Sequence, residues 1–286
     1  MLTAECFPQP VLAIIVVAEI STSQCSYSAM TVIRYNIAPT KEPFLTGNRP
    51  RSVVLLSGGM DSCVCAALAA RDTEAAALHI SYGQRTEQRE RRAFEGVCDR
   101  LGIKNRLKIR NEVLRTVGGS ALTDESIQVP EAEEQVGMQG IPVTYVPFRN
   151  THFLAAGVSW AEVLGADRVY IGAVEQDSSG YPDCRPAYYK AFNEAVKAGT
   201  REGTIEIFTP LIAMRKAAIV RLGLELGAPF DLTWSCYSRE DKACGTCESC
   251  ALRLRAFSDA GAEDPIPYAD QAADRFRFSS SLASGG

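Results

Sequence analysis

The sequence predicts an α/β fold in which helices cover both faces of a parallel β-sheet, the doubly wound arrangement. Two observations lead to this fold class. From residue 51 onward, short apolar segments alternate with longer segments whose apolar residues recur at helical spacing, a pattern typical of a parallel sheet between two helical layers. The chain also has 286 residues, of which 46% are hydrophobic and 22% charged, so it can bury a large core without a disulfide or a metal.

The first four elements begin at residue 52. Ser52–Leu56 has the sequence SVVLL, a short apolar run suited to a strand buried on both faces. Cys63–Ala70 is small and apolar, so a helix there can pack closely on a sheet. Ala75–Ser81 is predicted as the next strand. Glu87–Leu101 carries apolar residues at helical spacing and stops before Gly102, a residue that commonly ends a helix.

The alternation resumes after a long irregular segment. A strand at Asn105–Ile109 precedes residues 111–147, which are rich in Gly, Pro and Glu and form either a long functional loop or lid, or a disordered stretch. Asn150 can cap a helix that runs to Leu164. The remaining predicted elements are a strand at Arg168–Gly172, a helix at Tyr188–Lys197, a strand at Ile205–Phe208 and a helix at Lys216–Leu226.

The sequence divides into four parts. Residues 1–50 contain an apolar stretch, Val11–Ala18, but no Lys or Arg precedes it and acidic residues flank it, unlike a secretory signal peptide. We interpret 1–50 as a non-catalytic extension: a surface strand, an unstructured segment, or residues upstream of a second start at Met30. The α/β domain then covers 51–228, a C-terminal lobe 229–260 and a tail 261–286.

Composition and charge exclude several classes of function. The 30 Lys and Arg against 34 Asp and Glu give a net charge of −4, so no basic excess indicates a nucleic acid as principal partner. No apolar run approaches the ~20 residues of a membrane span, and we expect no membrane partner. The two histidines, His79 and His152, leave little material for a histidine-based catalytic triad.

The hexapeptide SGGMDS, which begins at Ser57, has the features of a phosphate site. It lies directly after a strand and before a helix, where unpaired backbone N–H groups and the helix dipole favour an anion. Gly58 and Gly59 allow the backbone to approach a ligand, and Ser57 and Ser62 supply hydroxyl donors. Asp61 would repel phosphate on its own, so we infer that it holds Mg²⁺ beside the phosphates.

SGGMDS resembles the pyrophosphate loop of the ATP pyrophosphatase superfamily, whose Rossmann-like fold is also called adenine nucleotide α-hydrolase-like. The resemblance implies ATP binding, usually with adenylation of a carbonyl or carboxyl oxygen. The motif is neither the dinucleotide-binding fingerprint nor the P-loop, because no Gly-Lys-Ser/Thr follows.

A second motif consists of four cysteines in a short stretch: Cys236, Cys244, Cys247 and Cys250. Two successive Cys-x-x-Cys steps with a fourth upstream thiol match a closed, structural Zn²⁺ site, in which no position is open to water. An iron–sulfur cluster also takes four cysteines and stays as an alternative. A redox Cys-x-x-Cys pair would need only two cysteines, so it does not explain all four. The clustering indicates a metal and a reducing compartment, and we expect the cytoplasm.

The segment SGYPDCRP, which begins at residue 179, follows the strand at Arg168–Gly172 and should open onto the carboxyl edge of the sheet, where ligands bind. Tyr181 could stack on a flat heterocycle. Asp183 could accept paired N–H donors from a guanine-like edge, and Arg185 could meet a carboxylate or phosphate. On their own, these residues also fit an ordinary polar loop.

Together these segments resemble the family of 7-cyano-7-deazaguanine synthases, over about Ser52 to Arg253. The matching segments are VVLLSGGMDS, SYGQR, SALTDESIQVP, VPFRN, SGYPDCRP, TPLI and WSCY with CGTCESCALR. One departure is Phe148, which stands where the family usually has glycine. By position, the resemblance assigns zinc to the four cysteines and ATP to a loop of Leu56, Ser57, Gly58, Gly59, Met60, Asp61, Ser62, Cys63, Val64, Cys65 and Ala66.

The implied reaction converts 7-carboxy-7-deazaguanine and ammonia to 7-cyano-7-deazaguanine, in queuosine precursor biosynthesis. Forming a nitrile removes both carboxylate oxygens, so we expect ATP to activate the carboxylate first and the resulting amide second. The superfamily resemblance favours AMP as the nucleotide product. The catalytic candidates are Asp61, which anchors Mg²⁺, and Arg85 and Arg149, which neutralise charge near the phosphates or the carboxylate.

Three other functions remain open from the sequence. The chain could be a tRNA-thiolating enzyme of the same superfamily, for which Cys184 is suggestively placed. It could be a relative that transfers the activated deazapurine acid to another acceptor. It could also be a zinc-knuckle binding module that keeps a nucleotide fold without activity. A homodimer is possible.

Overall fold

The computed structural model of the chain describes residues 49–132, 140–175 and 180–269. The extension predicted for residues 1–50 lies almost wholly outside this part, as do residues 133–139 of the predicted loop or lid. In the part of the chain that the structure describes, no helix is long and apolar enough to cross a membrane.

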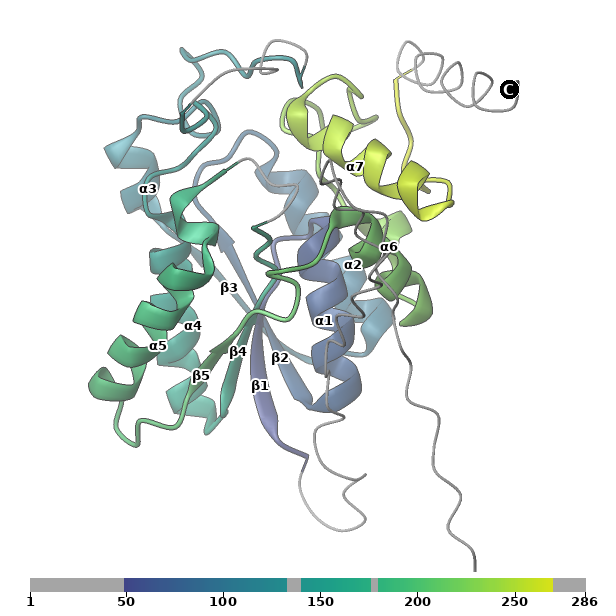
Figure 1. Cartoon of the computed structure of the whole chain (residues 1–286). Coiled ribbons are helices and arrows are strands. Elements are labelled where there is room, and N and C mark those ends of the chain that lie inside the picture. Colours follow the sequence, from purple (N-terminus) through teal and green to yellow (C-terminus); the bar gives the residue numbers. More distant parts are fainter. Residues whose placement is uncertain (1–48, 133–139, 176–179, 270–286) are drawn as a thin grey trace, which may run out of the picture. The chain divides into compact units, whose positions relative to one another are not determined.

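Five parallel strands form one sheet in the order β3-β2-β1-β4-β5. The chain starts at the centre of the sheet with β1, runs outward through β2 and β3, and then returns to the other side of β1 for β4 and β5 (Figure 1). This order confirms the doubly wound fold. The strands are β1 (Arg51–Leu55), β2 (Glu74–Ser81), β3 (Asn105–Arg110), β4 (Arg168–Ile171) and β5 (Glu206–Phe208).

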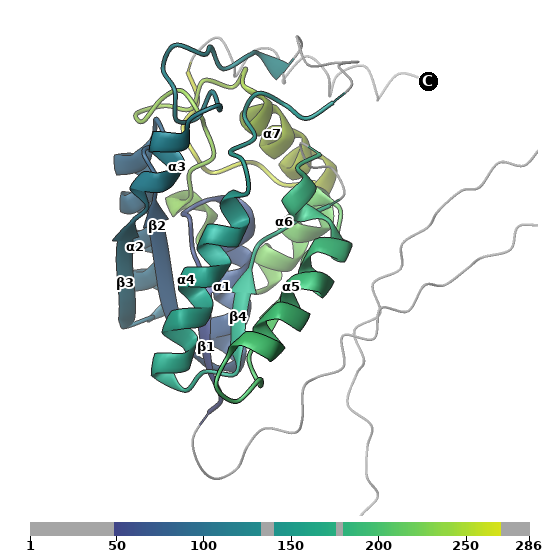
Figure 2. The same ribbon diagram turned by 90° about the vertical axis from the view of Figure 1, so that its left-hand side faces the viewer.

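Helices cover both faces of the sheet, as Figures 1 and 2 show from two directions. The central strand explains why, because its apolar side chains alternate between two cores. Val54 packs in the core that contains α1, α2 and α6, whereas Val53 and Leu55 pack against α4 and α5. The helices that cover the sheet are α1 (Met60–Asp72), α2 (Glu87–Leu101), α4 (Arg149–Leu164), α5 (Pro186–Gly199) and α6 (Lys216–Glu225), and a short helix, α3 (Glu112–Val117), follows β3.

The start of α4 differs from the sequence prediction. The helix begins at Arg149, and the residue before it, Phe148, occupies the N-cap position with a left-handed backbone (φ 58°). Asn150 is therefore not the cap. Its side-chain amide instead donates to the carbonyl of Asp183 at 3.0 Å and contacts the hydroxyl of Tyr189 at 3.4 Å. The side-chain amide of Asn150, which the local sequence predicted as a helix cap, therefore makes tertiary contacts instead.

Phe148 is the single non-glycine residue with a positive φ in the described part of the chain, a backbone conformation that glycine adopts without strain. We expect Phe148→Gly to be more stable than Phe148→Ala by about 1 kcal/mol, because both variants lose the ring but only glycine relieves the left-handed backbone. Chemical denaturation of the two variants measures this difference. Equal stabilities would show that the backbone is unstrained.

The C-terminal lobe contains α7 (Glu248–Ala260), a helix that the sequence did not predict. Arg253 on this helix is 2% exposed and forms a buried ion pair with Asp264, with Nε–Oδ2 at 2.7 Å and Nη2–Oδ1 at 2.9 Å. The hydroxyl of Tyr268 also donates to Asp264 at 2.7 Å. Residues 261–269, assigned to the tail from the sequence, thus pack on the lobe.

Candidate active site

A cavity of about 290 Å³ lies where the strand order reverses, between β1 and β4. At this switch point the two chain segments that leave β1 and β4 diverge to opposite faces of the sheet and leave a crevice at its carboxyl edge. The residues after β1, from Leu56 to Ser62, form one side of the cavity. Gly172 to Val174, after β4, form another side, and Arg149 and Asn150 at the start of α4 also line it.

The SGGMDS loop is held in shape by its own hydroxyl groups. The Ser57 hydroxyl accepts from the N–H of Gly59 at 3.2 Å and lies 3.1 Å from the Ser62 hydroxyl, which donates to the Gly59 carbonyl at 2.9 Å. Helix α1 begins immediately afterwards at Met60. The first N–H groups of a helix lack internal partners, so the loop presents an anion-binding end to the cavity.

Two glycines permit close packing around this loop. Gly58 has φ 94°, and a side chain there would come within 2.7 Å of the Glu90 carbonyl oxygen on α2. At Gly172, which follows β4, a side chain would lie 2.8 Å from both the Asp61 carbonyl carbon and the Ser62 nitrogen. Any larger residue at either position would displace the loop. Gly58 belongs to the motif that predicted the phosphate site, whereas no sequence signal indicated a role for Gly172.

The predicted ATP loop divides into two groups. Leu56, Ser57, Gly59, Met60, Asp61 and Ser62 line the cavity, and Gly58 supports the loop from behind. The remaining four residues are buried in the core on α1 and do not line the cavity: Cys63, Val64, Cys65 and Ala66.

Asp61 is paired with Lys216, the first residue of α6, with Nζ–Oδ2 at 2.5 Å. Both side chains line the cavity. The other carboxylate oxygen, Oδ1, is buried and accepts no hydrogen bond from the described residues. Lys216 was not predicted as a site residue, although it lies in the segment after β5, at the carboxyl edge of the sheet where ligands bind.

We expect Lys216→Met to lower kcat/KM for ATP by about 100-fold, because it removes a fixed positive charge from the phosphate end of the cavity. Steady-state kinetics with varied ATP measures this change. Lys216→Arg should recover part of the loss, and Lys197→Met, on the exposed surface of α5, is the control. An unchanged kcat/KM in Lys216→Met would contradict a role at the phosphates.

The two predicted arginines lie in different surroundings. Arg149 lines the cavity, donates to the Tyr82 hydroxyl at 3.2 Å and lies over the rings of Tyr82 and Phe153, 5.7 Å from each centroid. Its Nε is buried without a hydrogen-bond partner among the described residues, so this guanidinium has unused donor capacity. Burial raises the pKa of the Tyr82 hydroxyl to about 12, which keeps it protonated.

Arg85 also lines the cavity, but its guanidinium bonds to backbone carbonyls of the segment that follows Ser120. Nε donates to Ala121 at 2.8 Å, and Nη2 donates to Ile127 at 2.6 Å and Asp124 at 3.1 Å. These contacts fasten the segment beside the cavity.

Of the three predicted substrate residues, only Tyr181 lines the cavity, where its hydroxyl donates to Thr144 at 2.9 Å. Asp183 is 3% exposed, and its Oδ2 accepts from the backbone N–H of Asn150 at 3.0 Å. The Asp183 carboxylate thus fixes the start of α4 beside Arg149. Arg185 is exposed at the N-cap of α5 and does not line the cavity.

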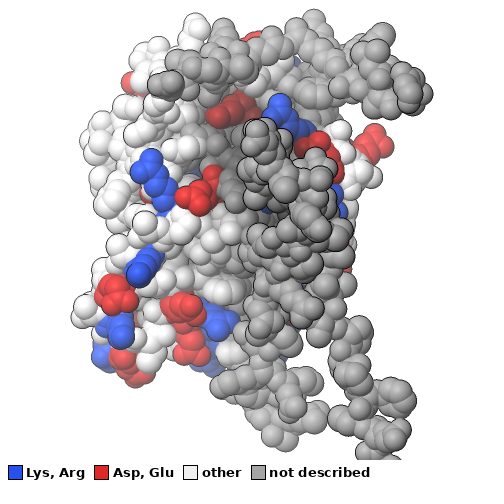
Figure 3. Space-filling model, viewed as in Figure 1, with Lys and Arg blue, Asp and Glu red and all other residues white. Residues whose placement is uncertain are grey.

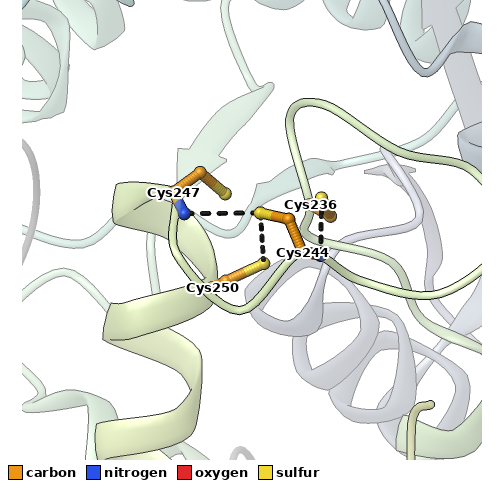
Figure 4. A group of neighbouring side chains, drawn as sticks. All are labelled: Cys236, Cys244, Cys247 and Cys250. Atoms are coloured by element: carbon orange, nitrogen blue, oxygen red, sulfur yellow. Dashed lines mark hydrogen bonds between the residues drawn. The ribbon is translucent and has the colours of Figure 1, made fainter. Parts of the chain in front are cut away.

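The four predicted metal ligands come together in the C-terminal lobe (Figure 4). The sulfurs of Cys236, Cys244, Cys247 and Cys250 all lie within 4.8 Å of one another, and those of Cys244 and Cys250 are 3.9 Å apart. Backbone N–H groups of Cys244 and Cys247 donate to sulfurs at 3.4 and 3.3 Å. Zn–S bonds of about 2.3 Å in a tetrahedron require sulfurs about 3.8 Å apart, so the cluster fits one ion.

The C-terminal lobe also forms one wall of the cavity, through Ser235, Tyr237 and Arg253 among others. Its link to the phosphate loop is direct, because the backbone N–H of Trp234 donates to the Gly58 carbonyl at 2.8 Å. The Arg89 guanidinium of α2 lies over the Trp234 ring, 4.4 Å from its centroid. The cysteine spacing predicted a structural metal site in this lobe and did not predict its contact with the phosphate loop.

A doubly wound parallel sheet with an anion-binding glycine loop at its switch point defines a nucleotide-binding α/β protein. The model of one family, "Queuosine biosynthesis protein QueC", matches residues 51–261. The chain belongs to this family.

Curated relatives agree with that membership. A "7-cyano-7-deazaguanine synthase" of Acidobacterium capsulatum is 66% identical over 228 residues, covering 79% of this chain and 99% of the relative. One of Koribacter versatilis is 65% identical over 230 residues, covering 79% and 97%. Among solved structures, the NH3-dependent NAD synthetase of Campylobacter jejuni aligns with a TM-score of 0.39 and 14% identity, over 66% of this chain and 68% of that chain.

Proposed function

We propose that the chain catalyses the ATP-dependent conversion of 7-carboxy-7-deazaguanine and ammonia to 7-cyano-7-deazaguanine. Family membership and the printed names of the relatives support this activity. The main structural support for this activity is the anion-binding loop, which opens into a cavity that Asp61, Arg149 and Lys216 also line. A triphosphate at the loop brings its α-phosphorus near a carboxylate bound in the same cavity.

Nitrile formation needs two activations, since a carboxylate oxygen is a poor leaving group. In the first, a carboxylate oxygen attacks the α-phosphorus of ATP and pyrophosphate leaves; ammonia then displaces AMP and gives the amide. In the second, the amide oxygen attacks the α-phosphorus of another ATP and pyrophosphate leaves; loss of AMP and of the two remaining N–H protons gives the nitrile. The loop N–H groups and Lys216 stabilise the departing pyrophosphate, and Arg149 neutralises the carboxylate charge.

Mg²⁺ and Zn²⁺ have separate places in this proposal. The free Oδ1 of Asp61, beside the phosphate loop, suits Mg²⁺, which would add positive charge at the phosphates. The four cysteines would hold Zn²⁺, because the short distances between their sulfurs suit a single ion better than a larger iron–sulfur cluster. With all four ligands supplied by the protein, zinc would act structurally.

The deazaguanine ring is assigned to the side of the cavity that Tyr181 lines, where the phenol can stack on it. Asp183 supports the site through the bond from the Asn150 N–H to its Oδ2, while its Oδ1 is buried without a hydrogen-bond partner among the described residues. The exposed Arg185 falls outside this arrangement.

The tRNA-thiolating alternative finds less support. It would use Cys184, which lines the cavity, as a thiolate, but burial raises the pKa of this thiol to about 11 and keeps it protonated near neutral pH. On the face of the molecule seen in Figure 3, basic and acidic side chains are interspersed over the described residues. Binding of tRNA favours a continuous basic surface instead.

Mass spectrometry of the products tests the proposal. The chain is incubated with 7-carboxy-7-deazaguanine, isotopically labelled ammonium, ATP and Mg²⁺. We expect 7-cyano-7-deazaguanine with one labelled nitrogen, together with AMP and pyrophosphate. Absence of the nitrile from the products would overturn the proposal. Detection of ADP as the only spent nucleotide would overturn the adenylation steps. Thionucleosides formed with tRNA and a sulfur donor would favour the alternative.

A further inference from the structure

Glu90, on α2, is the one acidic side chain besides Asp61 among the described residues that line the cavity. Its helix packs directly behind the phosphate loop, since the Glu90 carbonyl oxygen closes the space next to Gly58. Neither the sequence motifs nor the reaction scheme above gives this carboxylate a role.

The Glu90 carboxylate is held in one orientation. Oε2 accepts from the Gln84 side-chain amide at 2.8 Å, and Oε1 accepts from the Thr86 hydroxyl at 3.1 Å. Gln84 is itself fixed, because its Oε1 accepts from the backbone N–H of Tyr82 at 2.9 Å. Gln84, Thr86 and Tyr82 also line the cavity. A carboxylate with this support is preorganised rather than free at a surface.

The reaction has an unmet requirement, which is a place for the protons that leave nitrogen. When ammonia attacks the acyl-adenylate, the C–N bond forms, the C–O bond to AMP breaks and one proton leaves nitrogen. When the amide oxygen attacks the second ATP, pyrophosphate departs and nitrogen loses a second proton. When the C–O bond to the second AMP breaks, the third proton leaves and the C≡N bond is complete. Ammonium would release one proton more.

Other groups in the cavity are poorly suited to accept these protons. Asp61 is paired with Lys216. Burial raises the pKa of Cys184 to about 11 and that of Tyr82 to about 12, so both are already protonated near neutral pH. Arginine and lysine have no free lone pair when charged.

We propose that the Glu90 carboxylate is the base that receives each proton leaving the ammonia-derived nitrogen in turn and releases it to solvent before the next proton is transferred. This inference rests on the proposed function. Burial raises the pKa of Glu90 to about 7, against the hydrogen bonds from Gln84 and Thr86, which lower it. The charged and titratable groups that face it are Arg149 from α4, Tyr82 after β2 and Glu87 of its own helix. A general base works best with a pKa near the working pH.

Glu90→Gln tests the proposal because it keeps the shape of the side chain and removes its basicity. We expect nitrile formation to fall by about 100-fold near neutral pH. ATP–pyrophosphate exchange driven by 7-carboxy-7-deazaguanine without ammonium should fall far less, because the first adenylation moves no proton from nitrogen. In the wild type, kcat at saturating ammonium should rise with pH through about 7, and Glu90→Gln should lose this rise.

Asp99→Asn is the matched control, since it removes the same charge from α2 but lies near the far end of the helix, pairs with Arg106 and does not line the cavity. It should keep both the rate and the pH rise. If Glu90→Gln does not fold, as judged by circular dichroism, Glu90→Asp replaces it, and a slower enzyme that keeps the pH rise supports the proposal.

The failures of the two proposals are distinguishable. A wild-type chain that makes no nitrile refutes the proposed function. A wild-type chain that makes nitrile, with Glu90→Gln retaining both its rate and its pH rise, refutes the role of Glu90 alone. An equal loss of exchange and nitrile formation would also overturn it, since Glu90 would then act before ammonia enters.

Discussion

Asp61→Ala should lower nitrile formation by about 10³-fold. The carboxylate lies in the first turn of α1, next to the phosphate loop, where one oxygen holds Lys216 and the other is free for Mg²⁺. Its removal would leave the Lys216 ammonium without this partner and would weaken metal binding at the phosphates. Nitrile formation measured by mass spectrometry at saturating ATP gives the loss of rate.

Two comparisons make this experiment specific. Asp72→Ala, at the far end of the same helix and paired with Arg71, should leave the rate unchanged. Zinc content in Asp61→Ala should also be unchanged, because the cysteine cluster belongs to the C-terminal lobe. A variant at position 61 that retains wild-type activity would refute the role of this side chain at the phosphates.

Cys250→Ser is expected to be the most destabilising of the single substitutions. Cys250 is fully buried at the start of α7, and zinc binding by four thiolates contributes about 10–16 kcal/mol to the folding of small zinc domains. Loss of the metal should release the lobe, including the Trp234 N–H that bonds to Gly58. We therefore expect loss of both zinc and ATP binding, measured by metal analysis and by calorimetric titration with ATP.

Cys98→Ser is the matched control, because Cys98 is an equally buried cysteine on α2 that lies outside the cluster. It should keep its zinc and bind ATP like the wild type. If Cys250→Ser loses zinc but binds ATP with unchanged affinity, the lobe does not support the phosphate loop and the coupling inferred from Trp234 is wrong.

The sequence alone was sufficient to predict the elements that depend on interactions between residues close together in the chain. The run SVVLL predicted a strand buried on both faces, and the structure places its side chains in two cores. Helix α2 has the predicted bounds, Glu87–Leu101, because its apolar spacing and the terminal Gly102 are both local signals. The phosphate loop and the four cysteines were likewise recognisable from order and spacing alone.

Long-range contacts account for most of what the sequence analysis missed. Lys216 meets Asp61 across 155 positions of the chain, and no periodicity connects them. The buried Arg253–Asp264 ion pair holds part of the expected tail against the C-terminal lobe. The sequence did not predict this, because an isolated Asp in a polar stretch gives no sign that it is buried. Asn150 looked like a helix cap, but Asp183 and Tyr189 bind its amide. Glu90 was not predicted as a site residue, because its sequence neighbours on α2 are also charged and nothing in the sequence distinguishes it from them.

The proposed reaction depends on the triphosphate of ATP binding at the Ser57–Ser62 loop. A crystal structure of the chain with a non-hydrolysable ATP analogue and Mg²⁺ tests it most directly. We expect the β- and γ-phosphates to accept hydrogen bonds from backbone N–H groups of this loop, with Lys216 beside them and the adenosine within the cavity. A nucleotide bound at any other place, with this loop empty, would contradict the account.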